Sequence, residues 1–373
     1  DTLTSSIKEL AIWLIENGCE MVAMESTGAY WKPIYNILEL LCLDVMVVNA
    51  HHMKNVPGRK TDAKDAEWIA DLLQHGLLKS SYIPNKEQRE LREVVRYRKS
   101  LIEERSREIN RLEKTLEGAN IKLSSYVSDL IGVSSRKLLN QAMDGEVNQE
   151  NIGDLIHSSM HDKIPVLLKA MDGVLTPIQK KLVKAILDHI DDMTIRIKDL
   201  DDIIDNEMKD YDDAIKKIDE LPGIGKRSAE VIIAEIGIDM SRFPTAAHLA
   251  SWSGLCPGNN ESAGKRKSGK TNKGNKHLKS ILIQCAKSAK TNKESFFHAQ
   301  YQRLVARRGA NRATVAVAHS MLVAIYHMLK DNIPFKNLGS DYYTKFNTEK
   351  KANYHIKKLK ELGVSVPVSF ATA

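Results

Sequence analysis

A long uninterrupted helical pattern constrains this chain more than any other feature. From Gln88 to about Leu123 the sequence is highly charged, contains little Gly or Pro, and repeats apolar residues near a heptad spacing. The apolar positions are Leu91, Val94, Val95, Tyr97, Leu101, Ile102, Ile109, Leu112 and Leu116. A second helical stretch runs from Pro177 to about Glu220. Apolar stripes of this length need a partner, so we expect a long antiparallel arm or coiled coil.

The segment before this pattern alternates between helix and strand. Helices are expected at 4–17 and 31–41, and strands at 20–24 and 43–48, which is the rhythm of a mixed or parallel α/β sheet. We therefore predict an α/β domain followed by mostly α regions. The expected boundaries are 1–84 for the α/β domain, 85–220 for a helical or coiled-coil linker, 221–345 for a compact helical domain, and 346–373 for a tail.

Positive charge is concentrated in one part of the chain. The 373 residues carry a formal net charge of +7. Residues 261–312 contain fourteen Lys or Arg against two acids, whereas 188–220 contain thirteen acids against five bases. A local basic surface is typical of nucleic-acid binding, and the acidic stretch is expected to be a solvated helix face. The four cysteines lack metal-ligand spacing and no apolar run reaches transmembrane length, so we expect a cytoplasmic protein.

The basic segment begins in a loop, Pro257 to Lys279, that is rich in Gly and Asn. Lys and Arg neutralise phosphates, and glycines let backbone amides approach an anion closely. A serine in such a loop binds phosphate or attacks it; the alternative is a flexible basic loop with incidental serines. The nucleic-acid contacts expected here are Lys265, Arg266, Lys267, Ser268, Lys270, Lys273 and Lys276.

A second nucleic-acid signal, L-P-G-I-G-K-R, begins at Leu221. A tight turn with Gly223 and Gly225 between two helices is the pattern of a helix-hairpin-helix, in which amides at a helix N-terminus face a backbone phosphate. Lys226 and Arg227 add positive charge beside that turn. The alternative is an ordinary turn between two helices.

Three carboxylates are candidate metal ligands. Glu25 follows a predicted strand, and Asp62 and Asp65 lie three residues apart at the start of a predicted helix, so that both point from one face. Hard oxygen ligands of this kind suit Mg²⁺, which supports phosphoryl transfer. The alternative is helix capping, with Asp62 as N-cap and Asp65 near the positive helix end.

Four motifs occur in an order that resembles the IS110 family of insertion-sequence transposases. They are M-E-S-T-G-A-Y-W from Met24, P-G-R-K-T-D-A-K-D-A-E-W-I-A-D-L-L from Pro57, L-P-G-I-G from Leu221, and A-S-W-S-G-L-C-P-G-N-N-E-S-A-G-K-R-K-S-G-K-T-N-K-G-N-K-H-L-K from Ala250. The similarity runs through nearly the whole chain. These transposases are DEDD recombinases, in a lineage that includes the pilin-gene-inverting recombinase.

The resemblance implies a RuvC-like, ribonuclease-H-type N-terminal domain, a coiled coil and a C-terminal transposase domain. It implies Ser262 as a nucleophile that forms a covalent bond to DNA, with Mg²⁺ at Glu25, Asp62 and Asp65. Ser268 is then expected to be a phosphate contact. A structured guide RNA is implied to pair with donor and target DNA, and the protein is expected to form a dimer or tetramer.

One family feature is missing from the sequence. The family pattern begins with an Asp on a first strand, and nothing here matches it, so the chain is expected to start late in that pattern with an incomplete metal site. Two alternative functions follow. One is a RuvC-like junction-resolving endonuclease that hydrolyses DNA with water, and the other is a catalytically decayed nucleic-acid-binding protein.

Overall fold

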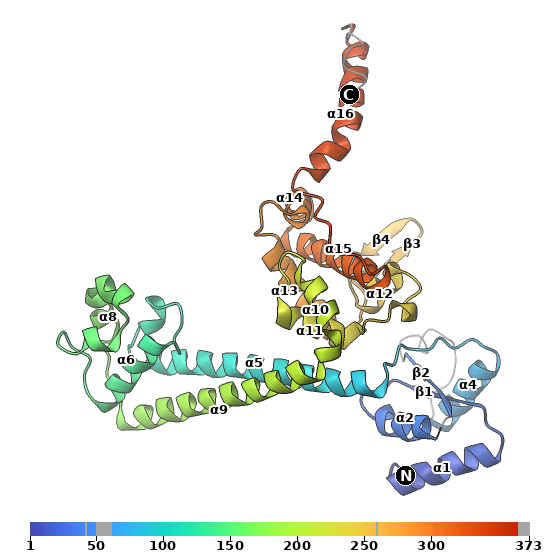
Figure 1. Ribbon diagram of the computed structural model, residues 1–373, viewed down its shortest axis with the longest axis horizontal. Helices are drawn as coiled ribbons and strands as arrows, with labels where there is room; N and C mark the ends of the chain where they lie inside the picture. The colour runs from blue at the N-terminus through green and yellow to red at the C-terminus, as the bar shows by residue number, and fades with distance from the viewer. Residues whose placement is uncertain (42, 50–61, 259, 365–373) are drawn as a thin grey trace. The chain divides into compact units, whose positions relative to one another are not determined.

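The computed structural model describes residues 1–41, 43–49, 62–258 and 260–364. The chain divides into two compact units, residues 1–85 (unit 1) and residues 86–373 (unit 2). Unit 1 contains a small parallel sheet, and unit 2 is mostly helical (Figure 1). The predicted combination of an α/β region with mostly α regions is therefore present. The division of residues 86–373 into linker, transposase domain and tail remains a prediction.

Unit 1 is built around two parallel strands. β1 (Met21–Glu25) pairs with β2 (Asp44–Val48), and the register runs from Met21 opposite Asp44 to Glu25 opposite Val48. The connection between parallel strands needs a crossover, which α2 (Trp31–Leu40) supplies. The core side chains are Ile7 and Ala11 of α1 (Thr4–Glu16), Leu38, Val47, Val48, and Leu72 of α4 (Asp62–Gln74).

Unit 2 begins with a long helical hairpin (Figure 1). α5 (Lys86–Gly118) and α9 (Pro177–Glu207) pack side by side along most of their lengths. As residue numbers rise along α5, the numbers of the residues that they contact on α9 fall. Arg98 pairs with Asp201, Arg105 Nη1 donates to Thr194 Oγ1 at 3.1 Å, and His189 lies 3.7 Å from a Glu108 carboxylate oxygen. The two helices are therefore antiparallel, as the two stripes predicted.

The far end of this hairpin carries a compact helical tip, residues 119–176. Its core joins Leu138 and Leu139 of the tip to Leu112 of α5 and Leu187 of α9. Thr176 closes the tip with a capping box, in which its Oγ1 and the Gln179 side chain cap each other's backbone amides. The tip elements are η1 (Leu123–Ser125), α6 (Val133–Asp144), α7 (Ile152–Leu155), η2 (Ser158–Lys163) and α8 (Ile164–Ala170).

The second long helix is shorter than predicted. The sequence suggested one helix over 177–220, but α9 ends at Glu207, and a 3₁₀ turn and a separate helix follow. The amphipathic pattern continues across this break because Ile215 and Ile218 of the separate helix also face the core. Pattern alone therefore did not reveal the change of direction. These elements are η3 (Lys209–Tyr211) and α10 (Asp212–Asp219).

Several of the remaining elements pack against one central helix, α15 (Ala310–Lys330). Its residues Val317, Met321, Leu322 and Ile325 are fully buried against α12, α13 and α14. α15 is long and apolar enough to cross a membrane by length and composition, but this is also the pattern of a protein's core helix, which matches its packing here. The elements of this part of the chain are α11 (Lys226–Ile236), η4 (Met240–Arg242), α12 (Ala246–Trp252), β3 (Asn260–Ser262), β4 (Lys265–Ser268), α13 (Lys276–Ala289) and α14 (Phe296–Arg308).

The C-terminal described helix is α16 (Tyr342–Glu361). An aromatic cluster attaches its first turn to α14, where Phe296 stacks on Tyr343 with ring centroids 5.4 Å apart and meets Tyr342 edge-on at 5.2 Å. The guanidinium of Arg303 lies 4.6 Å from the centre of the Tyr343 ring, within the range of a cation–π contact. The first turn of α16 is thus held by ring stacking.

Candidate active site

In unit 1, Glu25 is the last residue of β1 and pairs with Val48 in the sheet. The backbone amide of Ser26 donates to Val48 O at 2.9 Å, so pairing continues one step beyond the strand. The Glu25 side chain is partly buried and accepts a hydrogen bond from Thr27 Oγ1. The carboxylate therefore stands at the carboxyl edge of the parallel strands, where ligands gather in α/β sheets.

The other two predicted ligands begin α4. Asp62 is its first residue and Asp65 lies one turn later, exposed, on a helix that contacts β1. The Asp62 side chain and residues 50–61 lie outside the described residues. Within the described part, no three His, Cys, Asp or Glu side chains form a group that could hold a metal ion. The set of Glu25, Asp62 and Asp65 therefore remains a prediction, and so does the capping alternative.

In unit 2, the P-G-I-G segment forms a turn between the packed helices α10 and α11. Gly223 has a φ of +87°, and a Cβ there would lie 2.4 Å from Ala289 N and 2.5 Å from Cys285 O of α13. Only glycine permits both this conformation and this close approach. Gly223 therefore has a packing role, which the sequence prediction did not include.

The other glycine of this turn is more open. Gly225 is the N-cap of α11, makes no side-chain cap, and would place a Cβ no closer than 4.0 Å to Asp219. The first amides of a helix have no intrahelical acceptor and carry partial positive charge. The N-terminus of α11 therefore has the geometry expected of an anion site, although an ordinary helix start has it too.

Lys226 and Arg227 are already paired with acids of unit 2. Lys226 Nζ lies 2.8 Å from Asp205 Oδ1, and Arg227 donates to both Asp205 oxygens at 3.0 and 2.9 Å. Arg227 Nη1 also donates to Glu230 Oε2 at 3.0 Å. The hydrogen bond from Lys226 is the main reason that the pKa of Asp205 is lowered. The sequence predicted these cations as nucleic-acid contacts, which stays a prediction, and in the structure both have carboxylate partners on α9 and α11.

The predicted basic loop contains a β-hairpin. β3 and β4 are antiparallel, with Ser262 opposite Lys265 and the two-residue turn Ala263–Gly264 between them. Both turn residues have positive φ, 50° and 72°. Such turns match the twist of paired strands and favour glycine at the second position. The loop prediction was wrong here, because the A-G turn signal was not recognised within the basic run.

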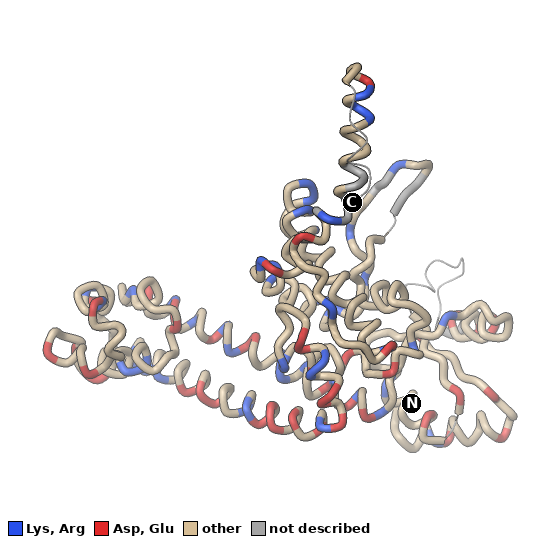
Figure 2. The backbone as a smooth tube through the Cα atoms, turned by 45° about the horizontal axis from the view of Figure 1, so that its top comes forward, with Lys and Arg blue, Asp and Glu red and all other residues tan. Residues whose placement is uncertain are grey.

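Ser262 is thus the last strand residue before the turn, and its side chain lies outside the described set. Ser268 ends β4, opposite Asn260, and its Oγ accepts from Lys270 N at 3.2 Å. The other predicted contacts that the structure describes, Lys265, Lys270, Lys273 and Lys276, are exposed. None of these four makes an ion pair among the described residues. Few acidic residues lie near the described lysines of the β3–β4 segment. Along α5 and α9, in contrast, acidic and basic residues alternate (Figure 2).

The base of the hairpin is tightly built. Gly258 N donates to Lys270 O at 2.9 Å, and Asn272 N donates to Cys256 O at 3.1 Å. Nearby, a Cβ on Gly274 would lie 2.3 Å from Gly254 N. Residues 254–258 and 270–274 therefore run backbone against backbone, and the motif glycines permit this contact.

Sequence reasoning missed a buried polar cluster below this base. Glu235 of α11 is fully buried and bonded to Arg96 of α5 and Asn275 at the start of α13. A charged residue inside the apolar run V-I-I-A-E-I was the available signal, because an unpaired carboxylate is rarely buried there.

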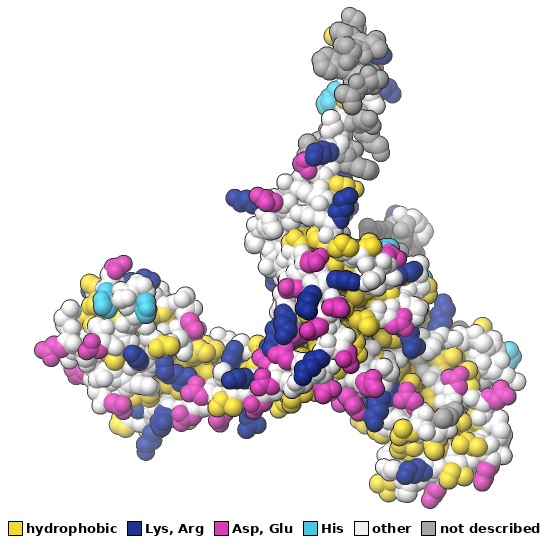
Figure 3. Space-filling model, viewed as in Figure 1, with side chains coloured by type: hydrophobic (Ala, Val, Ile, Leu, Met, Phe, Trp, Pro, Cys, Tyr) yellow, Lys and Arg dark blue, Asp and Glu magenta, His cyan; other side chains and the backbone are white. Residues whose placement is uncertain are grey.

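On the face shown in Figure 3, acidic and basic side chains are interspersed along the helical hairpin.

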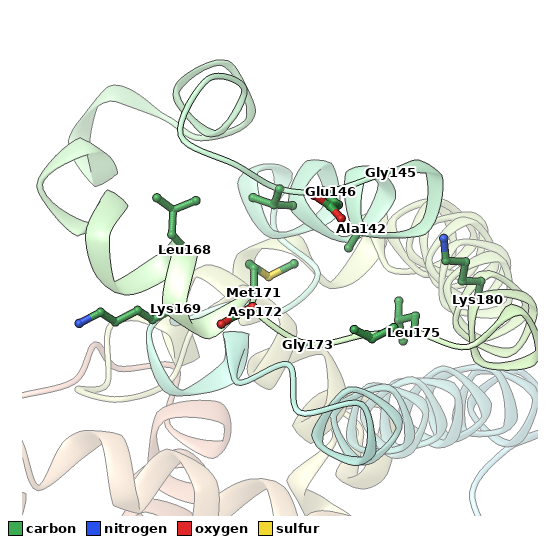
Figure 4. A pocket seen from close by; sticks show the side chains of 12 residues that line it. Ala142, Gly145, Glu146, Leu168, Lys169, Met171, Asp172, Gly173, Leu175 and Lys180 are labelled. Atoms are coloured by element: carbon green, nitrogen blue, oxygen red, sulfur yellow. The ribbon is translucent and has the colours of Figure 1, made fainter.

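A pocket of about 660 Å³ lies in the tip, away from these motifs (Figure 4). Leu168 and Met171 form part of its apolar wall, and Glu146, Asp172 and Lys180 add charged groups. None of the predicted site residues lines it. The pocket therefore gives no support to a small-molecule site for the chemistry that the motifs predict.

Comparison with known proteins places these motifs in a family. A family model of DEDD transposases, described as "Transposase", matches residues 3–121, and a second, described as "Transposase IS116/IS110/IS902 family", matches residues 215–302. The chain belongs to the IS110 family of transposases. It is accordingly an enzyme, a DNA transposase or recombinase of an insertion sequence, and it acts on DNA. The two matched segments contain Glu25, Asp62 and Asp65, and Ser262 with the glycine turn, respectively.

A relative from Streptomyces coelicolor supports the same assignment. The transposase is 25% identical over 305 residues to the "Insertion element IS110 uncharacterized 43.6 kDa protein" of that organism. The similarity covers 74% of this chain and 72% of the relative. It therefore extends beyond the segments that the two family models match.

Proposed function

We propose that this transposase cuts and rejoins DNA through Ser262 as nucleophile, together with Mg²⁺ held by Glu25, Asp62 and Asp65. The observation that carries the proposal is the β3–β4 hairpin. Its tip has Ser262 at the last strand position before a sharp turn, opposite Lys265, which is exposed and makes no ion pair among the described residues. The positive charge of the lysines would attract the phosphate that the Ser262 hydroxyl attacks.

The proposed step exchanges one phosphodiester for another. The Ser262 hydroxyl attacks the scissile phosphorus, an Oγ–P bond forms, and the bond from phosphorus to one deoxyribose oxygen breaks. The serine proton passes to a base and the leaving oxygen takes up a proton. A hydroxyl of a second DNA strand then attacks the serine-linked phosphorus and releases Ser262. Bond types are conserved, so the exchange needs no external energy source.

The three acids fit a hard divalent ion by their chemistry, because carboxylate oxygens are the ligands that Mg²⁺ prefers. Glu25 ends β1, and the helix that begins with Asp62 and carries Asp65 contacts that strand, which supports a shared site. Bound there, Mg²⁺ would lower the barrier by neutralising developing charge on oxygen.

The fold is consistent with the same proposal. The parallel strands support a RuvC-like fold for unit 1, and the antiparallel packing of α5 and α9 supports a coiled-coil arm.

The remaining predicted residues fit a nucleic-acid surface. Lys265, Arg266, Lys267, Ser268, Lys270, Lys273 and Lys276 are proposed to hold the backbone at the scissile site. The α10–α11 turn, with Gly223, Gly225, Lys226 and Arg227, is proposed to act as a helix-hairpin-helix on a neighbouring phosphate. A structured guide RNA is proposed to select the DNA. Two cuts on two strands call for several sites, so we propose a dimer or tetramer.

The test is the covalent bond itself. Purified protein with an N-terminal segment that supplies the family's first Asp is mixed with Mg²⁺, RNA transcribed from the DNA flanking the gene, and duplex DNA carrying the element's ends. We expect a denaturant-resistant protein–DNA adduct that mass spectrometry maps to Ser262. Ser262→Ala abolishes the adduct but retains binding, because the lysine contacts remain.

Ser268→Ala is the matched control, since it removes a hydroxyl from the paired strand of the same hairpin. It weakens binding and leaves an adduct detectable. An adduct that survives in Ser262→Ala would show that the nucleophile is another residue. DNA cleavage without any adduct would instead support the water-using, junction-resolving alternative.

A further inference from the structure

Glu235 is a fully buried carboxylate to which the proposed chemistry gives no role. Its side chain is 0% exposed, near the C-terminal end of α11. Arg96 grips it with two parallel bonds, Nε to Oε1 at 2.8 Å and Nη2 to Oε2 at 2.7 Å. Burial acts to raise the pKa of Glu235, but the hydrogen bond and charge of Arg96 outweigh it, so the pKa is lowered. The group is therefore an ion held inside the protein by its partners.

The α5 side of this contact is a stripe of three residues four positions apart. Gln88, Arg92 and Arg96 lie on one helix face. Gln88 Nε2 and Arg92 Nε each donate to Ala234 O at 3.1 Å. The last carbonyls of a helix have no intrahelical donor, so these side chains satisfy the end of α11. The first turns of α5 are thus fastened to the C-terminal end of α11.

The opposite side of Glu235 reaches α13. Asn275 Nδ2 donates to Glu235 Oε2 at 2.6 Å. The same side chain is the N-cap of α13, where its Oδ1 accepts from His277 N and Leu278 N, both at 3.0 Å. Its backbone amide donates to Trp252 O at 3.0 Å. One asparagine therefore connects the buried carboxylate, the start of α13 and the end of α12.

From Asn275 the chain leads directly to the hairpin base. Gly274 is the preceding residue, and it packs against the backbone of Gly254 so closely that no side chain fits between them. Residues 270–272 then bond to residues 256–258, and the β3–β4 hairpin extends from this pairing. The position of the hairpin base is thus tied, through Asn275, to Glu235 and Arg96.

We propose that Glu235 is a positioning residue for the site on the β3–β4 hairpin. Held by Arg96, its carboxylate fixes Asn275 and with it the base of the hairpin that carries Ser262. This inference rests on the proposed function, in which Ser262 reacts from that hairpin. A purely structural role for Glu235, limited to joining α5 and α11, would leave the hairpin base unaffected.

A swap of the two bonded groups tests this link. Glu235→Gln removes the charge, and Asn275→Asp keeps a good helix cap while facing Glu235 with a second carboxylate. In the double variant, the new amide at position 235 can donate to the new carboxylate at position 275. The bond is then restored with donor and acceptor exchanged, which a simple loss of stability cannot reproduce.

The matched control is Glu108→Gln. Glu108 is also a buried carboxylate on unit 2, 5% exposed, and it bonds to Arg111 and faces His189 within the helical hairpin. Its replacement removes a similar buried charge without touching Asn275. If the loss of one buried charge were enough to change exchange or excision, Glu108→Gln should show the same change as Glu235→Gln.

Two measurements on the full chain are compared. The first is amide hydrogen exchange over residues 254–278 without nucleic acid, and the second is excision from a plasmid that carries the gene with its flanking DNA. Glu235→Gln and Asn275→Asp should each speed exchange in that segment and lower excision, by up to about 100-fold for a displaced site. The double variant should recover much of both, and Glu108→Gln should change neither.

Unchanged exchange over 254–278 in Glu235→Gln would overturn the inference, and so would a double variant as impaired as its two parents combined. Should Asn275→Asp fail to fold alone, its recovery in the double variant remains decisive. Arg96→Lys keeps the positive charge but loses the bidentate pair of hydrogen bonds to Glu235. Its exchange rate over 254–278 and its excision should lie between those of wild type and Glu235→Gln. Failure of the proposed function is separate, because Ser262→Ala would then keep the adduct while the exchange results stand.

Discussion

The cations on and around the helical hairpin and those of the β3–β4 region differ in their partners. Arg96, Arg98, Arg136 and Arg227 each contact a carboxylate of unit 2. From Lys265 to Arg312, no described Lys or Arg makes an ion pair with a carboxylate that the structure describes. The same residue types therefore serve two purposes. Paired cations hold helices together, whereas the unpaired ones keep their charge for a polyanion.

The difference explains why net charge alone is a poor guide. The chain carries only +7 because acids on α9 and α10 offset its bases. Those acids lie on α9, where Asp191, Asp201 and Asp205 pair with arginines, and on α10. Pairing is therefore the feature that separates structural cations from available ones. The following experiments test this separation, from the largest expected effect to the smallest.

Arg96→Ala should have the largest effect, and on stability. It leaves the Glu235 carboxylate, 0% exposed, without its two-pronged partner. Breaking a buried pair by removing one member costs about 3–5 kcal/mol. Urea unfolding followed by circular dichroism measures the loss. Lys184→Ala is the control, because its pair with Asp188 is exposed and should contribute less than about 0.5 kcal/mol.

Replacing Lys265, Arg266, Lys267 and Lys270 together by Ala should mainly affect binding. Each lost phosphate contact lowers the slope of log affinity against log salt by about 0.7–0.9. Stability should change little, since the described side chains among them have no carboxylate partner. Fluorescence anisotropy with a labelled duplex at several salt concentrations measures the slope.

The control for this variant removes four paired cations instead: Arg111, Lys122, Arg136 and Lys184. These residues lie on the helical hairpin and its tip. Their replacement should leave the salt slope nearly constant while net charge falls equally. Equal loss of slope in both variants would mean that pairing does not separate the two groups of cations.

Asp205→Asn should have a smaller effect with the opposite sign. It removes the main carboxylate partner of Lys226 and Arg227, so that only Glu230 and Asp201 still offset their charge and both cations attract phosphate more strongly. We expect tighter binding and a salt slope steeper by about 0.7–0.9 for each new contact. Asp202→Asn on the same helix is the control, because Asp202 is exposed and has no ion pair in the described part of the chain. A shared gain in both variants would reflect net charge alone.

Two buried glutamates on α11 should respond to pH in opposite ways, with the smallest effects. Burial raises the pKa of Glu230 above 4.5 despite the bond from Arg227. Its contribution to stability is therefore full below pH 4.5 and is lost as pH rises through its folded pKa. The pKa of Glu235 is lowered, so its contribution is present above pH 4.5 and is lost as pH falls through its folded pKa.

Urea unfolding over about pH 3–8 distinguishes these two signs. Glu230→Gln should remove the loss of stability with rising pH, whereas Glu235→Gln should remove part of the loss in acid. The difference between each variant and wild type, plotted against pH, isolates each glutamate. Curves with the same slope for both variants would contradict the different partners assigned to Glu230 and Glu235.

Regular elements could be predicted from the sequence because their patterns are local. The strand before Glu25 and the helix from Gln88 followed from apolar periodicity and the placement of Gly and Pro. The end of α9 at Glu207 could not be predicted, because Ile215 and Ile218 continue the same stripe on a separate helix. Periodicity reports which side chains are buried and is insensitive to a break that keeps them buried.

The site was only partly accessible to sequence reasoning. The concentration of positive charge identified the β3–β4 segment as a nucleic-acid contact. The hairpin itself depends on two turn residues, Ala263 and Gly264, which lie within the basic segment and were not recognised as a turn. The pairing of Arg227 with Asp205 and of Arg96 with Glu235 joins residues far apart in the chain. Such partners depend on tertiary packing, which no local pattern encodes.

The antiparallel packing of α5 and α9 limits how this transposase can gain or lose residues in evolution. Moving from Arg98 to Arg105 on α5 corresponds to moving back from Asp201 to Thr194 on α9. A single insertion in one helix would turn every later side chain by about 100°, given 3.6 residues per turn, and separate such partners.

Matched insertions of seven residues in both helices would nearly preserve the facing surfaces, with a drift of about 20°. Each would move the tip outward by about 10 Å, since a helix rises 1.5 Å per residue. Changes in the reach of the tip should therefore occur in paired heptad steps.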